Sequence, residues 1–222
     1  MGTNGKFATV SRFGPGTPFV EAFGLLTTSL LLRNGTDGGR DINTICVTSA
    51  QPGAGTSTTA LNLALTMATA GRRTLLVDGN VRAPVLHVPF NVPQSPGLAE
   101  ILTKKAQVKE AIRASKTSNL YLLPAGAAEG SPAALMQPQL LGAILDQIRG
   151  SYEFAIMDTP PALRYPDALH IARATDGVIL VVPAEGAGRQ GQVEVRRRFE
   201  RVNVKILGVV MNRMNPREAV RG

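Results

Sequence analysis

Short, unbroken apolar segments that alternate with helix-like stretches constrain the fold of this sequence more than any other feature. The segments read TICVTS from Thr44, TLLVD from Thr74, LYLLPAG from Leu120, FAIMD from Phe154, GVILVVPA from Gly177 and KILGVVMN from Lys205. Strands that are apolar throughout are typical of a parallel sheet whose two faces are both covered by helices. We therefore predict an α/β fold of three layers with a mostly parallel central sheet. In such sheets, ligands bind at the carboxyl ends of the strands.

Length and composition predict one folded domain. The chain has 222 residues, of which 44% are hydrophobic, enough to bury one substantial core. Residues 1–18 are rich in Gly, Thr, Asn and Pro and are expected to form a flexible arm, with residues 19–222 forming the domain. Cys46 is the only cysteine, which excludes a disulfide scaffold. No segment approaches the roughly 20 apolar residues that span a bilayer, and no secretory leader is recognisable, so we expect a cytoplasmic protein.

The net charge of +8 has its densest cluster late in the chain. The cluster consists of Arg196, Arg197, Arg198, Arg201 and Lys205. It is interpreted either as the solvated face of a helix or as a docking surface for an anionic membrane or an acidic partner. Nucleic acid is not expected as a partner, because only 5% of the residues are aromatic and no stacking motif lies between the charges.

The sequence SAQPGAGTSTTALNLAL, from Ser49 to Leu65, has the form of a phosphate-binding loop that opens a helix. Glycines let backbone amides approach a phosphate, and the N-terminus of the helix favours negative charge. In the pattern G-x-x-x-x-G-K-[ST], Gly55 takes the second glycine, Thr56 the lysine and Ser57 the metal-binding hydroxyl. An incidental tight turn is the alternative. The residues expected to bind nucleotide are Gly53, Ala54, Gly55, Thr56, Ser57 and Thr58.

Two aspartates follow apolar segments and are the candidate catalytic residues. Asp78 ends TLLVD, where its carboxylate can hold a metal-bound water or accept a proton. Arg82 lies four residues later and can pair with Asp78 or with phosphate; a helix cap or a salt-bridged turn is the alternative. Asp158 ends FAIMD, the pattern of a Walker B strand, whose carboxylate orders magnesium through water. Ser57 and Asp158 are therefore the expected metal site.

Together these motifs resemble those of the bacterial tyrosine autokinases, P-loop proteins that control capsule and exopolysaccharide synthesis, from about residue 18 to 214. Family members read Pro-Gly-Glu-Gly-Lys-Ser-Thr where this chain has PGAGTST, and Asp-x-Asp-x-Arg where it has Asp78, Asn80 and Arg82. The segments DTPP and GLAEIL match the family as they stand. The match of ILGVVMN implies that Asn212 contacts the adenine base.

The resemblance also implies a three-layer P-loop NTPase-like fold, Mg²⁺ with ATP or ADP as cofactors, and a partner. That partner is the cytosolic tail of a membrane polysaccharide copolymerase, a chain-length regulator, which would associate the chain peripherally with the membrane. Asp167, which also matches the family, either caps a helix or touches the site.

Four departures from the family pattern point away from kinase activity. Thr56 replaces the lysine, and Asn80 replaces the second aspartate of its motif. Gly24 and Thr27 replace two arginines that, in the family, pack subunits into a ring. The tail lacks the tyrosine cluster that receives phosphate. The combination predicts a pseudokinase with vestigial Asp78 and Asp158, and a monomer or dimer in place of a ring.

The free-energy cost of the missing lysine can be estimated. A unit charge about 4 Å from a phosphate oxygen is worth roughly 4 kcal/mol at an effective dielectric near 20, about a thousandfold, and mostly in the transition state. One alternative is an active tyrosine autokinase in which another cation, such as Arg82, compensates. A second is a ParA/MinD-type ATPase, but such proteins carry a further lysine where this chain has Gln51.

Overall fold

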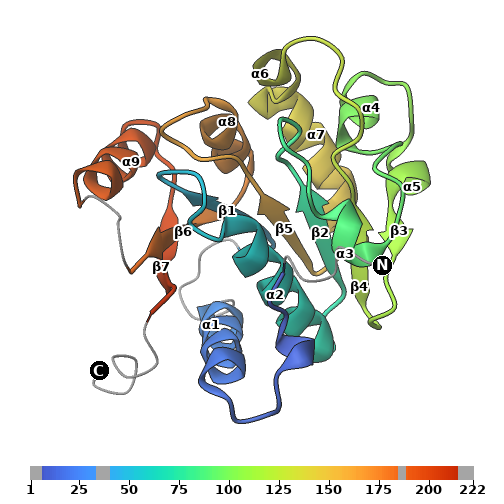
Figure 1. Ribbon diagram of the computed structural model, residues 1–222. Helices are drawn as coiled ribbons and strands as arrows, with labels where there is room; N and C mark the ends of the chain where they lie inside the picture. Colours follow the sequence, from blue (N-terminus) through green and yellow to red (C-terminus); the bar gives the residue numbers. More distant parts are fainter. Residues whose placement is uncertain (1–6, 34–40, 185–188, 215–222) are drawn as a thin grey trace.

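The computed structural model describes residues 7–33, 41–184 and 189–214, and these residues build a seven-stranded sheet. The strand order is β3-β4-β2-β5-β1-β6-β7, and every neighbouring pair is parallel except β3 with β4 (Figure 1). The strands are β1 (Thr44–Ser49), β2 (Thr74–Asp78), β3 (Arg113–Ala114), β4 (Leu120–Leu123), β5 (Phe154–Asp158), β6 (Gly177–Pro183) and β7 (Ile206–Asn212). The predicted mostly parallel sheet is confirmed.

Helices cover both faces of the sheet, so the three-layer α/β prediction is also confirmed. Figure 1 shows α1 and α2 on one side, and α7 and α8 on the other. Successive β1 residues point to opposite sides: Ile45 and Val47 join the core beneath α1 and α2, and Cys46 joins the other core. The helices are α1 (Pro18–Arg33), α2 (Thr56–Thr69), α3 (His87–Phe90), α4 (Leu98–Leu102), α5 (Val108–Ala111), α6 (Pro132–Leu135), α7 (Pro138–Arg149), α8 (Asp167–Ala174) and α9 (Arg189–Arg201), with a 3₁₀ turn η1 (Val10–Arg12).

The strand register brings the chemically interesting residues to one edge of the sheet. β1 lies between β5 and β6, and β2 lies beside β5. Asp78 at the end of β2 is the register partner of Asp158 at the end of β5. Because these strands run parallel, the loop after β1 and both aspartates meet at the carboxyl edge.

Helix α2 is buried around most of its circumference, which explains its composition. It starts after Gly55, whose φ of +93° favours glycine, and the chain leaves it through Gly71 at φ +82°. Its buried residues include Leu61, Leu63 and Met67, because it packs on the sheet on one side and beneath α1 on the other. A helix that is apolar nearly all round is expected in such a place.

The segment before α1 differs from the expected flexible arm within the described residues. Residues 10–12 form η1, and Phe7 is buried. Asn62 of α2, fully buried, accepts a hydrogen bond from the Val10 amide at 2.7 Å and donates one to the Ala8 carbonyl at 2.8 Å. A buried amide must find partners, and this segment supplies them. Residues 1–6 of the predicted arm lie outside the described residues.

The β3 edge of the sheet also differs from what its sequence suggests. Residues 108–114 form a helix-like stretch in the sequence, but α5 ends at Ala111. Ile112 turns extended, and Arg113 then pairs antiparallel with Leu122 of β4. Two residues are too few for a strand pattern to be visible in the sequence. Throughout the described part of the chain, each helix is too short or too polar to cross a bilayer.

Candidate functional site

The loop after β1 presents its backbone as an anion site. Gly53 and Gly55 both have positive φ values, +79° and +93°. Among the described residues, nothing accepts a hydrogen bond from the backbone amides between Gly53 and Thr58. Consecutive free amides ahead of a helix N-terminus form a concave site suited to phosphate. The six predicted residues that belong to the loop itself, Gly53 to Thr58, thus lie together at this turn, and their binding of nucleotide stays a prediction.

Thr56 occupies the lysine position and is engaged within the loop. Its hydroxyl donates a hydrogen bond to the Ser49 hydroxyl at 3.0 Å, and Ser49 donates to the Gln51 carbonyl at 2.9 Å. The side chain therefore closes the base of the loop and brings no charge to it. Ser49, buried at the end of β1, was not singled out by the sequence, because only loop closure brings it to Thr56.

Asp158 is fully buried, and within the described residues neither carboxylate oxygen has a hydrogen-bond partner of normal geometry. Burial, together with the neighbouring Asp78, raises the pKa of Asp158 well above its usual value, and the Ser57 hydroxyl offsets this in part. An unpartnered buried carboxylate is costly unless a cation or a proton joins it. The arrangement of Asp158 and Ser57 therefore fits the Mg²⁺ site expected from the sequence.

Asp78 lies beside Asp158 but is satisfied by the backbone. Its carboxylate accepts hydrogen bonds from the Val85 and Leu86 amides, both at 3.0 Å, and from the Asn80 amide at 3.3 Å. Burial nevertheless raises the pKa of Asp78 to about 6. This side chain organises the turn after β2, and its predicted catalytic role stays a prediction.

Arg82 is paired with Asp167 in the structure. Its guanidinium donates to the two carboxylate oxygens of Asp167 at 2.6 and 3.2 Å and lies 4.5 Å from the centre of the Tyr165 ring. Asp167 begins α8 and is fully buried. Releasing Arg82 would leave that carboxylate buried without its cation, which is costly. The pairing of Arg82 with Asp167 was not anticipated from the sequence.

Asn212 reaches the loop from the end of β7. Its side-chain amide donates to the Ala54 carbonyl at 2.8 Å, and a side chain at position 55 would collide with it, since a Cβ there would lie 2.0 Å away. The φ of +93° already strains any other residue at position 55, and a side chain there would also have to displace the Asn212 amide. The contact of Asn212 with adenine stays a prediction, but the residue is placed at the loop.

The described residues contain no group of three His, Cys, Asp or Glu side chains that would enclose a metal ion by themselves. This composition suits Mg²⁺, which usually keeps several waters and takes further oxygens from phosphate. Asp158 and Ser57 are the residues placed to hold such an ion.

A glycine loop between a buried strand and a helix, with a buried aspartate on the neighbouring strand, defines a P-loop nucleotide-binding protein of the α/β class. Comparison with known proteins refines this class. A family model described as an AAA domain matches residues 42–209. Tyrosine-protein kinase YwqD of Bacillus subtilis (strain 168) is 32% identical over 78% of this chain and 73% of its own length.

Solved structures agree. The crystal structure of the chimerical protein CapA2B2 is 31% identical, with a TM-score of 0.85 over 92% of this chain and 89% of that one. The chain belongs to the bacterial tyrosine autokinase family of capsule and exopolysaccharide synthesis. The septum site-determining protein MinD of Pyrococcus horikoshii, solved with Mg-ADP, is less similar: 25% identity and a TM-score of 0.68 over 80% of this chain and 75% of that one.

Proposed function

We propose that this chain is a nucleotide-binding pseudokinase that regulates capsule or exopolysaccharide synthesis and export. The observation that carries the proposal is the position of Thr56. Where the family has a lysine, this hydroxyl bonds to Ser49, and the nearby Arg82 is paired with Asp167. The chain keeps the fold of the family but lacks, at position 56, the cation that phosphoryl transfer requires.

Features that favour binding of the ground state are kept. The free amides of the loop and the N-terminus of α2 attract the phosphates of ATP or ADP. Ser57 and Asp158 would hold Mg²⁺, which, when bound, neutralises charge on the phosphates. Asn212 is placed beside the loop for a contact with the base. We infer that nucleotide binding survives.

Phosphoryl transfer depends more strongly on the missing charge. An ammonium group about 4 Å from a phosphate oxygen contributes roughly 4 kcal/mol, which corresponds to about a thousandfold in rate when it acts in the transition state. Arg82 can replace it only by leaving Asp167, and that exchange offsets most of the gain. The alternative of an active, compensated kinase is therefore disfavoured.

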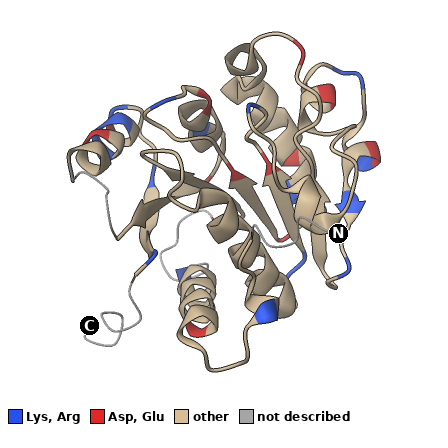
Figure 2. Ribbon diagram, in the orientation of Figure 1, with Lys and Arg blue, Asp and Glu red and all other residues tan. Residues whose placement is uncertain are grey.

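Family membership supports a membrane polysaccharide copolymerase as the partner that holds this chain at the cytoplasmic face of the membrane. Direct docking of α9 on anionic lipid has less support. Figure 2 shows acidic and basic residues side by side on this helix, and two of its arginines are paired, Arg196 with Glu200 and Arg198 with Glu194. Alternating charges that pair within one helix are typical of a solvent-exposed helix surface.

The test is to restore the lysine. We expect calorimetry to show that the wild-type chain binds Mg-ADP and Mg-ATP, with negligible hydrolysis of ATP and negligible labelling of the protein by radioactive ATP. Thr56→Lys should tighten Mg-ATP binding by about tenfold or more and raise ATP hydrolysis by about a hundredfold or more.

The matched control is the double variant Thr56→Lys/Asp158→Ala, which should return to the wild-type background. Wild-type protein that labels itself at rates typical of active kinases would overturn the proposal. If that activity were lost in Arg82→Ala, the alternative hypothesis would be correct: an active kinase in which Arg82 compensates for the missing lysine.

A further inference from the structure

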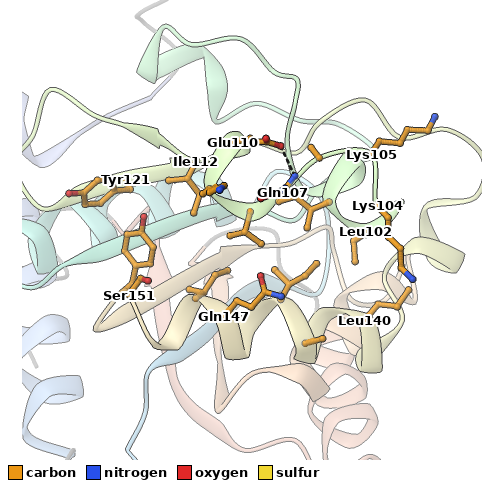
Figure 3. Close-up of a pocket in the computed structure, with 18 of the residues that line it drawn as sticks. Leu102, Lys104, Lys105, Gln107, Glu110, Ile112, Tyr121, Leu140, Gln147 and Ser151 are labelled. Carbon is orange, nitrogen blue, oxygen red and sulfur yellow. Dashed lines mark hydrogen bonds between the residues drawn. The ribbon is translucent and has the colours of Figure 1, made fainter.

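A large groove lies at the β3–β4 edge of the sheet, between α7 and the segment that joins α4 to α5 (Figure 3). Its volume is about 1040 Å³, at the upper end of the range for small-molecule sites. One wall is a single stripe of α7 and the turn after it: Leu140, Ala143, Ile144, Gln147, Ile148 and Ser151. We call this cavity the α7 groove.

The α7 groove is separate from the nucleotide site. Strands β2 and β5 stand between β4, which borders the groove, and β1, which carries the phosphate loop. Arg73 and Tyr152, at one end of the groove, precede β2 and β5 and so lie toward the opposite edge of the sheet from Asp78 and Asp158. The groove and the predicted nucleotide site share no residue.

The α7 wall of the groove is long enough to lie along about two turns of another helix. From Leu140 to Ile148 its wall rises about 12 Å, slightly more than two helical turns. Leu140 is 39% exposed, and the exposed residue Ala143 is small enough for another backbone to approach closely. Below them, Ile144 and Ile148 are buried and provide an apolar floor. An amphipathic helix is recognised by grooves of this kind.

The rim of the groove is positively charged. Lys104 and Lys109 are exposed and make no ion pair within the described residues, and Figure 3 shows Lys104 extending toward Leu140. Among the described residues that line the groove, Glu110 is the one acidic residue, and its carboxylate accepts a hydrogen bond from the Gln107 amide at 2.9 Å.

The other cations of the rim are partnered. Lys105 pairs with Glu129 at 2.7 Å. Arg73 is stacked on two rings, 4.9 Å from the centre of Tyr121 and 5.3 Å from that of Tyr152. The unpaired charge that a ligand would meet therefore comes from Lys104 and Lys109.

We propose that the α7 groove docks an acidic amphipathic helix of a partner protein. The apolar floor requires an apolar face, and the two unpaired lysines require carboxylates beside that face. A second copy of this chain is a poor occupant, because each copy carries a net charge of +8. A bilayer surface is also a poor occupant, because a flat surface does not reach the floor of a groove.

The probe is a fluorescein-labelled helical peptide of about 14 residues, with leucines along one face and glutamates elsewhere, followed by fluorescence anisotropy. The reference peptide has the same composition in an order that spreads the leucines around the helix. We expect the amphipathic peptide to bind at least about tenfold more tightly than the reference. Lys104→Glu/Lys109→Glu should weaken its binding about tenfold, and Ala143→Trp, which fills the groove, by a similar factor.

The control is Lys116→Glu/Lys205→Glu, which changes the net charge equally at exposed positions outside the groove and should shift binding less than about twofold. Equal affinity for the two peptides, or equal loss in the control and groove variants, would overturn the proposal. Two further results would also refute the proposal. If the groove variants abolished binding to phosphatidylglycerol vesicles with no effect on the peptide, the groove would bind lipid. If they changed the mass of the free protein in light scattering, the groove would bind a second copy of the chain.

Discussion

At the scale of single residues, the pair of buried carboxylates at Asp78 and Asp158 makes the stability of the folded chain sensitive to pH. Their pKa values are raised, that of Asp78 to about 6 from 3.8, chiefly by burial. The folded protein thus holds these protons more tightly than the unfolded chain does. For Asp78, the stabilisation is fully present below about pH 3.8 and is lost as the pH rises through about 6.

Removing the charge at Asp158 should therefore stabilise the protein in the absence of nucleotide and metal. We expect Asp158→Asn to raise the free energy of unfolding by about 1–3 kcal/mol at pH 8, because the variant no longer buries an unpartnered carboxylate. The gain should be smaller at pH 5 than at pH 8, because the pKa of Asp158 is raised and protonation, which removes the buried charge, becomes more complete as the pH falls. Urea unfolding at the two pH values measures both quantities.

The control for this variant is Asp146→Asn, since Asp146 lies on the surface and pairs with Arg149. Its effect should stay within about 0.5 kcal/mol at either pH. A destabilised Asp158→Asn protein at pH 8 would show that the carboxylate is held by interactions that the structure does not contain.

The sequence predicts which residues gather at the carboxyl edge of the sheet but not which partners they have there. Asp158 and the glycines of the loop were predictable, because a strand end and a Gly-rich turn are visible in a local pattern. The hydroxyl contact of Thr56 with Ser49 and the ion pair of Arg82 with Asp167 depend on how separate loops meet. No spacing in one sequence encodes such contacts.

At the scale of secondary-structure elements, η1 and the residues before it are fastened to α2 by one side chain. Asn62 bonds to the backbone of Val10 and Ala8 and also donates to the Thr58 carbonyl within its own helix, at 2.8 Å. The described part of the expected arm is thereby docked.

Replacing Asn62 by Ala should undock this segment. We expect a loss of about 1–3 kcal/mol in the free energy of unfolding, since the Val10 amide and the Ala8 carbonyl lose their partner. Hydrogen exchange should rise at residues 8–13 and stay unchanged in β1. Thr66→Ala, which removes a hydroxyl bonded only within α2, is the matched control. Unchanged exchange in Asn62→Ala would mean that apolar contacts such as those of Phe7 hold the segment alone.

The six longer strands and the main helices were predictable, because each is a continuous apolar or amphipathic stretch. The shortest elements were not. Helix α5 ends at Ala111, and Arg113 pairs with β4. The unpaired edge of β4 favours this strand pairing, and local propensity does not. Edge pairing of this kind becomes visible only once the neighbouring strand is in place.

At the scale of the whole molecule, two positions that the family resemblance associates with ring assembly carry other residues in this chain. The family resemblance places arginines at positions 24 and 27, where this chain has Gly24 and Thr27. Thr27 is buried, only 3% exposed, and so offers no side chain to a neighbour. The positive net charge of each copy further opposes self-association.

We therefore expect a monomer or a dimer by light scattering at micromolar concentrations and about 0.15 M salt. The double variant Gly24→Arg/Thr27→Arg tests whether these two positions alone decide the outcome, with circular dichroism to check that it folds. An octamer in the wild-type protein would refute the prediction.

The bond from Asn212 to the Ala54 carbonyl ties the last strand of the sheet to the rim of the phosphate loop. If the Asn212 amide donated to an adenine ring, its hydrogen bond to the Ala54 carbonyl would break. Nucleotide binding would then change the conformation at the end of β7. Even without catalysis, this exchange of hydrogen bonds would give the chain one conformation with nucleotide and another without it.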